Sequence, residues 1–128
     1  MKLLIDHNLP HWWADTLRPF CQHHLASETH ALQDLLPKNA TDLEVFEFAN
    51  KGDWVILTQD KYRHRLERDV IHAHKIKAYN FHGWQKFPMN EQLSKLFRAI
   101  PKIIENASTI SGGGVFFVGY KNGNIYLP

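Results

Sequence analysis

The chain has 128 residues, of which 44% are hydrophobic and 12% aromatic, enough for one compact domain with a real core and too few for two. A formal net charge of +2 and a pI of about 8.7 give a mildly basic balance that does not by itself identify a nucleic-acid-binding protein. A single cysteine, Cys21, excludes an internal disulfide and a cysteine-rich zinc site. We therefore expect one domain over residues 1–128, located in the reducing cytoplasm, with Cys21 as an unreactive core thiol.

Targeting and membrane-spanning segments are not evident in the sequence. Met1 and Lys2 lead into a short apolar run that Asp6 and Asn8 interrupt, which is too short and too polar for a signal peptide. Apolar runs stay well below the roughly eighteen residues of a membrane span. We expect a soluble, intracellular protein with no membrane partner.

The N-terminal segment predicts a strand, a helix and a second strand. Residues 2–5 are an apolar run typical of a buried parallel strand. Asn8 is a good helix cap and Pro10 is tolerated in a first turn, so a helix should start here and end near Pro19. A second strand is expected around residues 22–27, followed by an irregular segment.

A capping box predicts the start of the next helix. The Thr41 side chain can accept from the amide of Glu44 while the Glu44 side chain reaches back. This helix should run to about residues 51–52. Asp42 shares a helical face with the apolar positions three, four and seven residues further on, so it should lie at the N-terminal end of the buried stripe, directed toward the sheet edge.

Strands and helices continue to alternate in the second half of the chain. Residues 54–59 predict a third strand, residues 62–74 a helix, and residues 75–81 a strand with period-two alternation. A long amphipathic helix should begin at residues 89–90, with a kink or a break at Pro101.

The C-terminal stretch predicts a β-hairpin extension. Residues 111–114, with three glycines in a row, should form a hinge, and two strands should follow at 115–120 and 124–127. The pair Asn122-Gly123 between them favours a type I′ turn. Because an isolated two-stranded ribbon is marginal in water and this one is apolar on both faces, we expect it to pair with the main sheet or with a second subunit.

Together these elements predict an α/β fold with a mainly parallel central sheet, right-handed crossovers and helices on both faces. The core should span about residues 1–107, and the hairpin at 112–128 should extend it.

Two aspartates come directly after apolar strands. Asp6 follows the strand at 2–5, and Asp60 follows the strand at 54–59. Ligands bind outside the carboxyl ends of the strands in an open α/β sheet, so both carboxylates should face one crevice. Asp42, at the start of the intervening helix, would complete a cluster of oxygen ligands suited to Mg²⁺ or Mn²⁺.

These acids lie in motifs that resemble the PIN-like domains of bacterial toxin–antitoxin type. In chain order the motifs are Leu4 to Pro10, with an acid after the first strand; Ala40 to Glu44, with an acid on an early helix; and Ile56 to Lys61, with a Thr-x-Asp after a later strand. The stretch from Asp60 to Arg68 also looks like the Asp-Lys followed by basic residues and Glu-Arg in one branch of these proteins. The resemblance covers residues 1–82 and implies a PIN-like, three-layer α/β/α fold.

The resemblance further implies a metal-dependent endoribonuclease, typically a toxin held in check by an antitoxin from a neighbouring gene. The implied cofactor is Mg²⁺ or Mn²⁺, and the implied partners are RNA and a cognate antitoxin protein, with a homodimer as a further option. By their positions in these motifs, the resemblance implies that Asp6, Asp42 and Asp60 are catalytic metal ligands. Glu67 is a candidate fourth catalytic acid.

The acidic cluster departs from the family pattern at two positions. His7 stands where close relatives often have Glu, and Tyr62 stands where some have a second Asp. This thinner cluster motivates an alternative function, in which a catalytically weak or inactive PIN-like protein binds nucleic acid or another protein.

The residues around the acids also favour phosphodiester hydrolysis independently of the resemblance. A divalent metal can neutralise the phosphate oxygens and activate water. The cations placed to attract the phosphate backbone are Lys61, Arg63, Arg65 and Arg68. Asn8 and Thr58 are further candidates for substrate binding, although helix capping and backbone bonding explain them equally well. Exposed Tyr62 or Trp84 could stack on the bases of a single strand.

Other interpretations compete with this one. Taken alone, Asp6 and Asp60 are equally turn formers, and Asp42 is a favourable charge at a helix start. A zinc site is disfavoured, because His23 and His24 should point to opposite faces of a strand and the remaining histidines lack a closing set of ligands. A phosphatase or receiver-like protein would need a lysine at another strand end, and none is identifiable.

Overall fold

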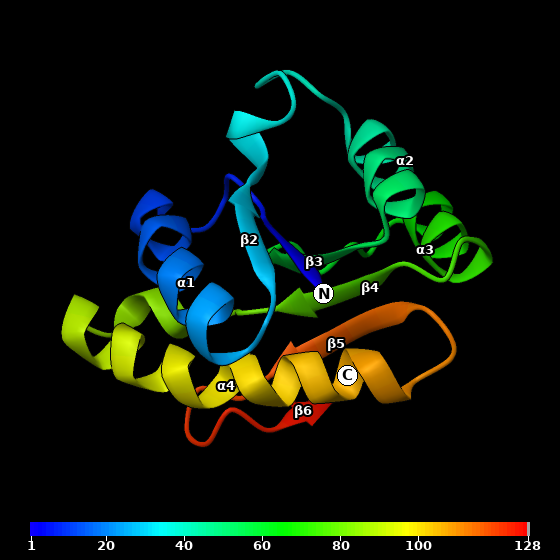
Figure 1. Ribbon diagram of the computed structural model, residues 1–128. Helices are drawn as coiled ribbons and strands as arrows, with labels where there is room; N and C mark the ends of the chain where they lie inside the picture. Colours follow the sequence, from blue (N-terminus) through cyan, green and yellow to red (C-terminus); the bar gives the residue numbers. More distant parts are fainter. Residues whose placement is uncertain (128) are drawn as a thin grey trace.

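The computed structural model describes residues 1–127 (Figure 1). Pro128, the last residue of the predicted hairpin segment, lies outside the described residues. The elements in chain order are β1 (Lys2–Ile5), α1 (His11–His24), β2 (Glu28–Ala31), the 3₁₀ turn η1 (Leu32–Asp34), α2 (Asp42–Gly52), β3 (Trp54–Thr58), α3 (Arg65–Ala73), β4 (Lys77–Asn80), the 3₁₀ turn η2 (Trp84–Lys86), α4 (Met89–Thr109), β5 (Gly114–Val118) and β6 (Ile125–Tyr126). Within residues 1–127, no helix has the length and apolar character needed to cross a bilayer.

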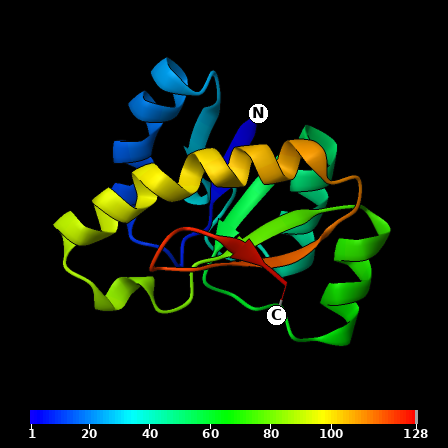
Figure 2. The same ribbon diagram turned by 90° about the horizontal axis from the view of Figure 1, so that it is seen from below.

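The six strands form one sheet in the order β2-β1-β3-β4-β5-β6. Strands β1 to β5 pair in parallel, and β6 runs antiparallel to β5. The resulting hairpin forms one edge of the sheet, next to α4 (Figure 2). The predicted α/β fold with a mainly parallel sheet and a C-terminal hairpin is confirmed, and the apolar strand of that hairpin finds its partner in β4.

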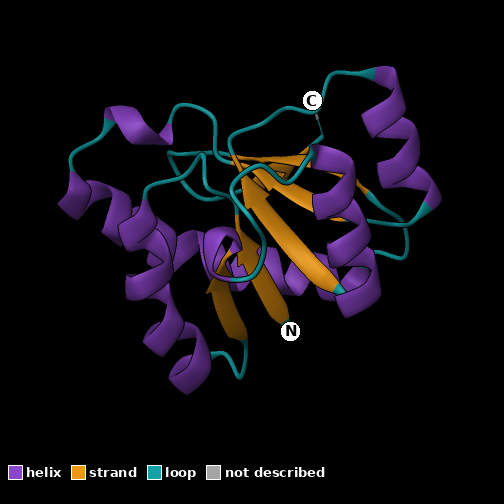
Figure 3. Cartoon of the chain, turned by 90° about the horizontal axis from the view of Figure 1, so that it is seen from above, coloured by secondary structure: helices purple, strands orange, loops and turns teal. Residues whose placement is uncertain are grey.

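Two hydrophobic layers lie on opposite faces of the sheet. In β1, Leu3 and Ile5 pack into the layer that contains α1 and α4, whereas Leu4 packs into the layer that contains α2 and α3. Residues of β3 alternate in the same way, as the pleat of a strand requires. Figure 3 shows helices on both sides of the sheet, which confirms the three-layer architecture.

Helix α1 is longer than the sequence predicts. It continues past Pro19, which is exposed, because Leu17 and Cys21 are completely buried on its inner stripe. Packing of this stripe outweighs the backbone hydrogen bond that proline cannot make. The strand predicted at 22–27 is therefore wrong: those residues, with their two histidines, finish the helix and form a turn, and β2 begins at Glu28.

The predicted capping box at the start of α2 is confirmed. The Glu44 N–H donates to Thr41 Oγ1 at 3.2 Å, and the Thr41 N–H donates to the Glu44 carboxylate at 3.2 Å. Asp42 is exposed at the N-terminal end of the stripe whose later members, Val45 and Phe46, are buried. The helix start is thus decided locally, and it holds Asp42 beside the sheet edge.

Helix α3 begins later than predicted, at Arg65 instead of Tyr62. Tyr62 has a left-handed backbone (φ +47°), and its side chain is only 1% exposed. Its ring packs edge-on against Phe46, with ring centroids 5.0 Å apart. Because this ring is buried, the helix begins only at Arg65, and an ordered loop follows Asp60.

The glycine run that leads into β5 is closely packed at Gly113, and its expected role as a hinge stays a prediction. A Cβ atom on Gly113 would lie 2.6 Å from three backbone atoms of residues 71–76. Of the kink or break predicted in α4 at Pro101, the break is absent. This helix is continuous through Pro101, because Ile100 before the proline and Ile103 after it are both buried in the core.

The hairpin turn differs from the predicted type I′. That turn requires a positive φ at both central residues, whereas Gly123 has one (φ +70°) and Asn122 does not. A longer loop joins the strands instead, closed by the Gly119 N–H, which donates to the Asn124 carbonyl oxygen at 2.8 Å.

Candidate active site

The candidate site lies where the strand order of the sheet changes direction. From β1 the chain passes to β2 on one side and then to β3 on the other side of β1. The carboxyl ends of β1 and β3 flank this switch point, which is the usual binding crevice of an open α/β sheet. Asp6 directly follows β1, and Asp60 lies two residues after Thr58, the last residue of β3. The prediction that both aspartates follow neighbouring strands is confirmed.

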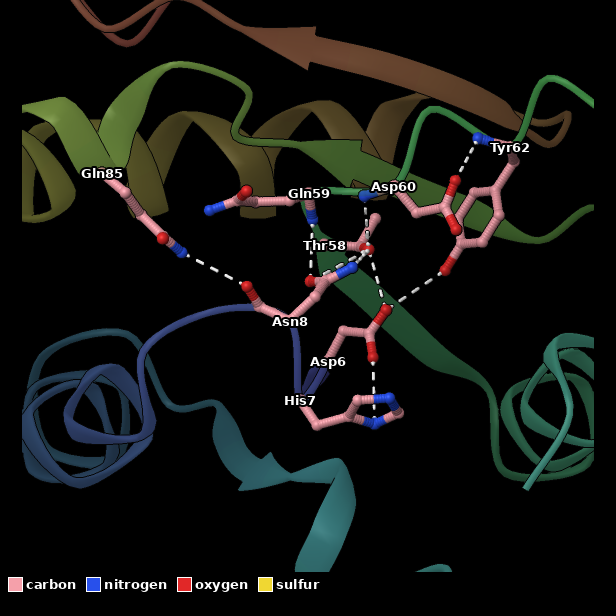
Figure 4. A network of polar contacts seen from close by, with 8 residues as sticks. All are labelled: Asp6, His7, Asn8, Thr58, Gln59, Asp60, Tyr62 and Gln85. Atoms are coloured by element: carbon pink, nitrogen blue, oxygen red, sulfur yellow. Dashed lines mark hydrogen bonds and ion pairs between the residues drawn. The ribbon is translucent and has the colours of Figure 1, made fainter. Parts of the chain in front are cut away.

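Thr58 is the centre of a polar network at this edge (Figure 4). Its hydroxyl donates to Asp6 Oδ2 at 2.8 Å and accepts from the backbone N–H of Asp60 at 3.0 Å. The Asn8 side-chain amide donates to the same oxygen at 3.1 Å. Because Thr58 is completely buried, one inaccessible hydroxyl orients the surroundings of both aspartates.

Asn8 links the first loop to β3 and does not cap α1 as predicted. Its Oδ1 accepts from the Gln59 N–H at 3.0 Å, and its backbone oxygen accepts from Gln85 Nε2 at 3.2 Å (Figure 4). Helix α1 follows Pro10 without a side-chain cap. Asn8 therefore holds the segment after Asp6 against the end of β3.

A second set of hydrogen bonds shapes the loop that carries Asp60. Asp60 Oδ1 accepts from the Tyr62 N–H at 2.8 Å, and the Asp60 backbone oxygen accepts from Asn80 Nδ2 at 2.9 Å. Arg68 donates from α3 to the backbone oxygens of Lys61, at 2.8 Å, and of Tyr62. The loop is thus held from both β4 and α3.

Asn80 was not singled out from the sequence. It ends β4, is 1% exposed, and positions the Asp60 loop through its side-chain amide. The signal that could have found it is the one that marks Asp6 and Thr58, a polar residue at the carboxyl end of an apolar strand.

Tyr62 faces Asp6 from the core, with its hydroxyl 3.5 Å from Asp6 Oδ2. Burial, followed by the negative charge of Asp6, raises the pKa of this phenol well above its usual value, so it stays protonated and points a donor at the carboxylate. Tyr62 is therefore not the exposed base-stacking platform predicted. The same correction applies to Trp84, which is fully buried and donates from Nε1 to the Val118 carbonyl oxygen at 2.9 Å.

Asp6 is itself largely buried, with 8% of the residue exposed. Burial raises the pKa of its carboxyl, against the lowering effects of the hydrogen bond from Thr58 and of the neighbouring His7. The ring of His7 lies on the solvent side, with Nδ1 3.4 Å from Asp6 Oδ1. A partly desolvated carboxylate of this kind is favoured in its charged form by a nearby cation.

Asp42 and Glu67 bring two more carboxylates from the first turns of α2 and α3. A hydrogen bond with the Asp42 carboxyl raises the pKa of Glu67 to about 7, and desolvation and the charges of Asp42 and Asp60 act in the same direction. The charge of Asp42 also raises the pKa of Asp6. The charge of Asp42 thus acts on both Asp6 and Glu67, as expected for carboxylates grouped near one site.

The family model described as PIN like domain matches residues 1–83, a stretch that contains all four acids. The chain belongs to the PIN-like domain family. No curated protein and no solved structure gives a significant match. The resemblance inferred from the sequence motifs is thus confirmed at the level of the family.

The acids of this PIN-like domain have the donor chemistry of a hard-cation site. Among residues 1–127, no three acidic, histidine or cysteine side chains are already arranged to hold one metal ion. The carboxylate of Asp6 is turned toward Thr58, and that of Asp60 toward the Tyr62 N–H. Mg²⁺ usually keeps several waters and binds proteins through one or two carboxylates. The acids offer the oxygen donors that such a hydrated ion prefers, and the assignment of Asp6, Asp42 and Asp60 as its ligands stays a prediction.

The basic residues after Asp60 divide into two groups in the PIN-like domain. Arg68 is half-buried and bonded to backbone carbonyls of the loop, so it is a positioning residue and not the free phosphate-binding side chain expected. Arg63 and Arg65 are exposed, and Lys61 is partly exposed. These three cations remain the candidates for contact with a phosphate backbone.

Proposed function

We propose that this PIN-like domain is a metal-dependent endoribonuclease that uses Mg²⁺ or Mn²⁺. The observation that carries the proposal is the placement of four acids at the switch point of the sheet: Asp6 and Asp60 follow two neighbouring strands, and Asp42 and Glu67 lie in the first turns of two helices. Nuclease activity is general among PIN-like domains, and all four acids lie within the matched residues.

The residues of the site have separate roles in this proposal. When bound by Asp6, Asp42 and Asp60, the metal would neutralise the phosphate oxygens, activate a water and stabilise the leaving oxygen. Thr58 keeps the Asp6 carboxylate oriented, and Glu67 supplies a fourth carboxylate beside Asp42. The exposed cations after Asp60 attract the RNA backbone.

We further propose that the protein is the toxin of a toxin–antitoxin pair and acts in the cytoplasm, with an antitoxin protein as its partner. The motif from Asp60 to Arg68 supports the toxin assignment, and the buried free thiol of Cys21 is compatible with a reducing compartment.

A binding role without catalysis is the alternative. The observation that favours it is the state of Asp6, which is largely buried and already engaged by Thr58, Tyr62 and His7. If this carboxylate cannot turn toward a metal, the same edge would bind RNA or a protein without cleaving.

The test is cleavage of a generic single-stranded RNA by the purified protein, with Mn²⁺ or with EDTA. Asp60→Asn keeps the oxygen that accepts the Tyr62 N–H but removes the ligand charge, so it should reduce Mn²⁺-dependent cleavage to background. Asp15→Asn, at an exposed position on α1, is the matched control and should cleave like the parent protein.

The outcomes separate the alternatives. Cleavage that survives in Asp60→Asn contradicts the proposed site, and a parent protein that binds RNA without cleaving it supports the binding role. Colony growth on induction tests the toxin assignment: growth arrest should require Asp60 and not Asp15.

A further inference from the structure

A hollow of about 370 Å³ lies at the carboxyl ends of β4 and β5, beside the acidic site. This volume is within the range of small-molecule pockets, about 300–1,000 Å³. It is lined by Asn80, His82, Phe117, Val118, Gly119, Tyr120, Lys121, Asn122 and Tyr126. Among these described residues none is acidic, in contrast to the neighbouring carboxylate cluster.

The hollow and the acidic site share a wall. Asn80 lines the hollow and donates from Nδ2 to the Asp60 backbone oxygen at 2.9 Å. It is also paired with Thr58 in the sheet register. Neighbouring strands are about 4.8 Å apart, so a ligand in the hollow lies one strand away from the network that orients Asp6 and Asp60.

The hollow combines aromatic rings with cations. The rings of Phe117 and Tyr126 stand edge to face, with centroids 5.8 Å apart, and Tyr126 is 53% exposed. Lys61 Nζ lies 5.9 Å from the Phe117 centroid, and Lys121 is exposed on the rim. Aromatic faces flanked by lysines are how proteins bind single-stranded nucleic acid, with the base stacked and the phosphate neutralised.

The wall formed by the hairpin is held in place by α4. Lys102 Nζ donates to the Asn122 carbonyl oxygen at 2.7 Å and to Asn124 Oδ1 at 2.9 Å. A Cβ atom on Gly123 would come within 3.0 Å of the Ala99 backbone, so the loop is packed directly on the helix. A pocket whose wall is pre-ordered loses less conformational entropy when a ligand binds.

We propose that this hollow, which we call the base pocket, receives one unpaired base of an RNA strand whose neighbouring phosphate lies at the acidic site. The proposal rests on the endoribonuclease function proposed above and specifies its substrate as single-stranded RNA. It assigns base stacking to Phe117 and Tyr126, which lie outside the residues matched by the family. Base stacking thus falls to the hairpin, in place of the buried Tyr62 and Trp84.

Binding of a fluorescently labelled single-stranded RNA in EDTA tests the base pocket without any cleavage. Tyr126→Ala should weaken binding by about 5- to 150-fold, the range for loss of one stacked base, and Tyr126→Phe should bind within about twofold of the parent protein, since every ring keeps its π-face. Tyr126→Leu keeps apolar contact with Phe117 but not stacking, and it should be weakened like the alanine variant. If Tyr126→Ala does not fold, the binding measured for Tyr126→Leu tests the proposal instead. Phe97→Ala, which removes an exposed ring on α4 outside the pocket, is the control and should bind normally.

Three results would overturn the base pocket: no RNA binding by the parent protein, unchanged binding by the folded Tyr126→Leu variant, or the same dependence on Tyr126 with fully double-stranded RNA. Parallel reactions with Mn²⁺ separate this proposal from the proposed function. Binding that depends on Tyr126 without cleavage refutes the nuclease alone, whereas cleavage with binding independent of Tyr126 refutes the base pocket alone.

Discussion

The hydroxyl of Thr58 donates a 2.8 Å hydrogen bond to Oδ2 of Asp6 and so joins the end of β3 to the residue that follows β1. The same oxygen accepts the backbone N–H of Asp60 at 3.0 Å. Both aspartates at the switch point therefore depend on one buried side chain. Because a buried polar group without a partner costs more than a formed hydrogen bond contributes, a change at Thr58 should affect the whole site.

Replacing Thr58 by valine keeps the shape of the side chain but removes this hydroxyl. The variant leaves Asp6 without its closest donor and the Asp60 N–H without its acceptor, so the free energy of unfolding should fall by roughly 1–3 kcal/mol. Urea unfolding at neutral pH measures this loss. Thr58→Ser retains the hydroxyl and should lose less; a valine variant as stable as the serine variant would contradict the role of the hydroxyl.

The metal-free protein should become less stable as the pH rises from about 4.5 to about 7. The pKa of Glu67 is raised from its ordinary value of 4.5 to about 7 in the fold, so the folded chain keeps a proton that the unfolded chain has released. The stabilisation is complete below the unfolded pKa and is lost as the pH rises through the folded one. Burial raises the pKa of Asp6 as well, and its contribution has the same sign. Urea unfolding at a series of pH values in EDTA measures the slope.

The matched variants for this pH effect are Glu67→Gln and Glu91→Gln. Each glutamate lies in the first turn of a helix, α3 for Glu67 and α4 for Glu91. Only the change at Glu67 should flatten the decline in stability. A decline that is unchanged in Glu67→Gln would show that other groups cause it.

Arg68 and the exposed arginines before it should behave differently when replaced. Arg68→Ala removes the hydrogen bonds to the backbone oxygens of Lys61 and Tyr62, so the free energy of unfolding should fall by roughly 1–3 kcal/mol, since hydrogen bonds from charged groups are among the stronger ones. The double variant Arg63→Ala, Arg65→Ala should leave stability within about 0.5 kcal/mol, as is usual for exposed positions.

The double variant should instead change RNA binding. Each phosphate of a single strand that a side chain neutralises adds about 0.7 to the slope of log K against log salt, so removing both arginines should make the slope shallower by about 1.4. Anisotropy titrations between low and moderate salt measure the slope. An unchanged slope would assign both arginines to another surface role, such as an antitoxin interface.

Two adjacent glycines before β5 should differ in their tolerance of alanine. A Cβ at Gly113 would lie 2.6 Å from backbone atoms, whereas one at Gly112 meets nothing within 4 Å. Gly113→Ala should therefore lower the free energy of unfolding by roughly 1–3 kcal/mol, as overpacking does, and Gly112→Ala should be neutral or slightly stabilising. Thermal unfolding of both variants measures the difference; equal stability would mean that the segment yields as a hinge.

Features set by neighbouring residues were predictable from the sequence alone. The capping box of Thr41 and Glu44 closes within one turn, so its hydrogen bonds form wherever the helix lies. The apolar runs of β1 and β3 determined that both strands are buried and that Asp6 and Asp60 leave the sheet at the same edge. The order of these signals along the chain was also sufficient to recognise the PIN-like family.

Only the tertiary structure decided which polar and aromatic groups contact one another across the fold. Arg68 has the sequence context of a phosphate-binding side chain, but α3 places it against the carbonyls of Lys61 and Tyr62. Tyr62 and Asn80 acquired their roles in the same way, because burial of an aromatic ring and pairing of a strand-end amide depend on which elements meet. Local sequence encodes periodicity and capping, whereas the partner of a buried polar or aromatic group is known only once the chain has brought distant segments together.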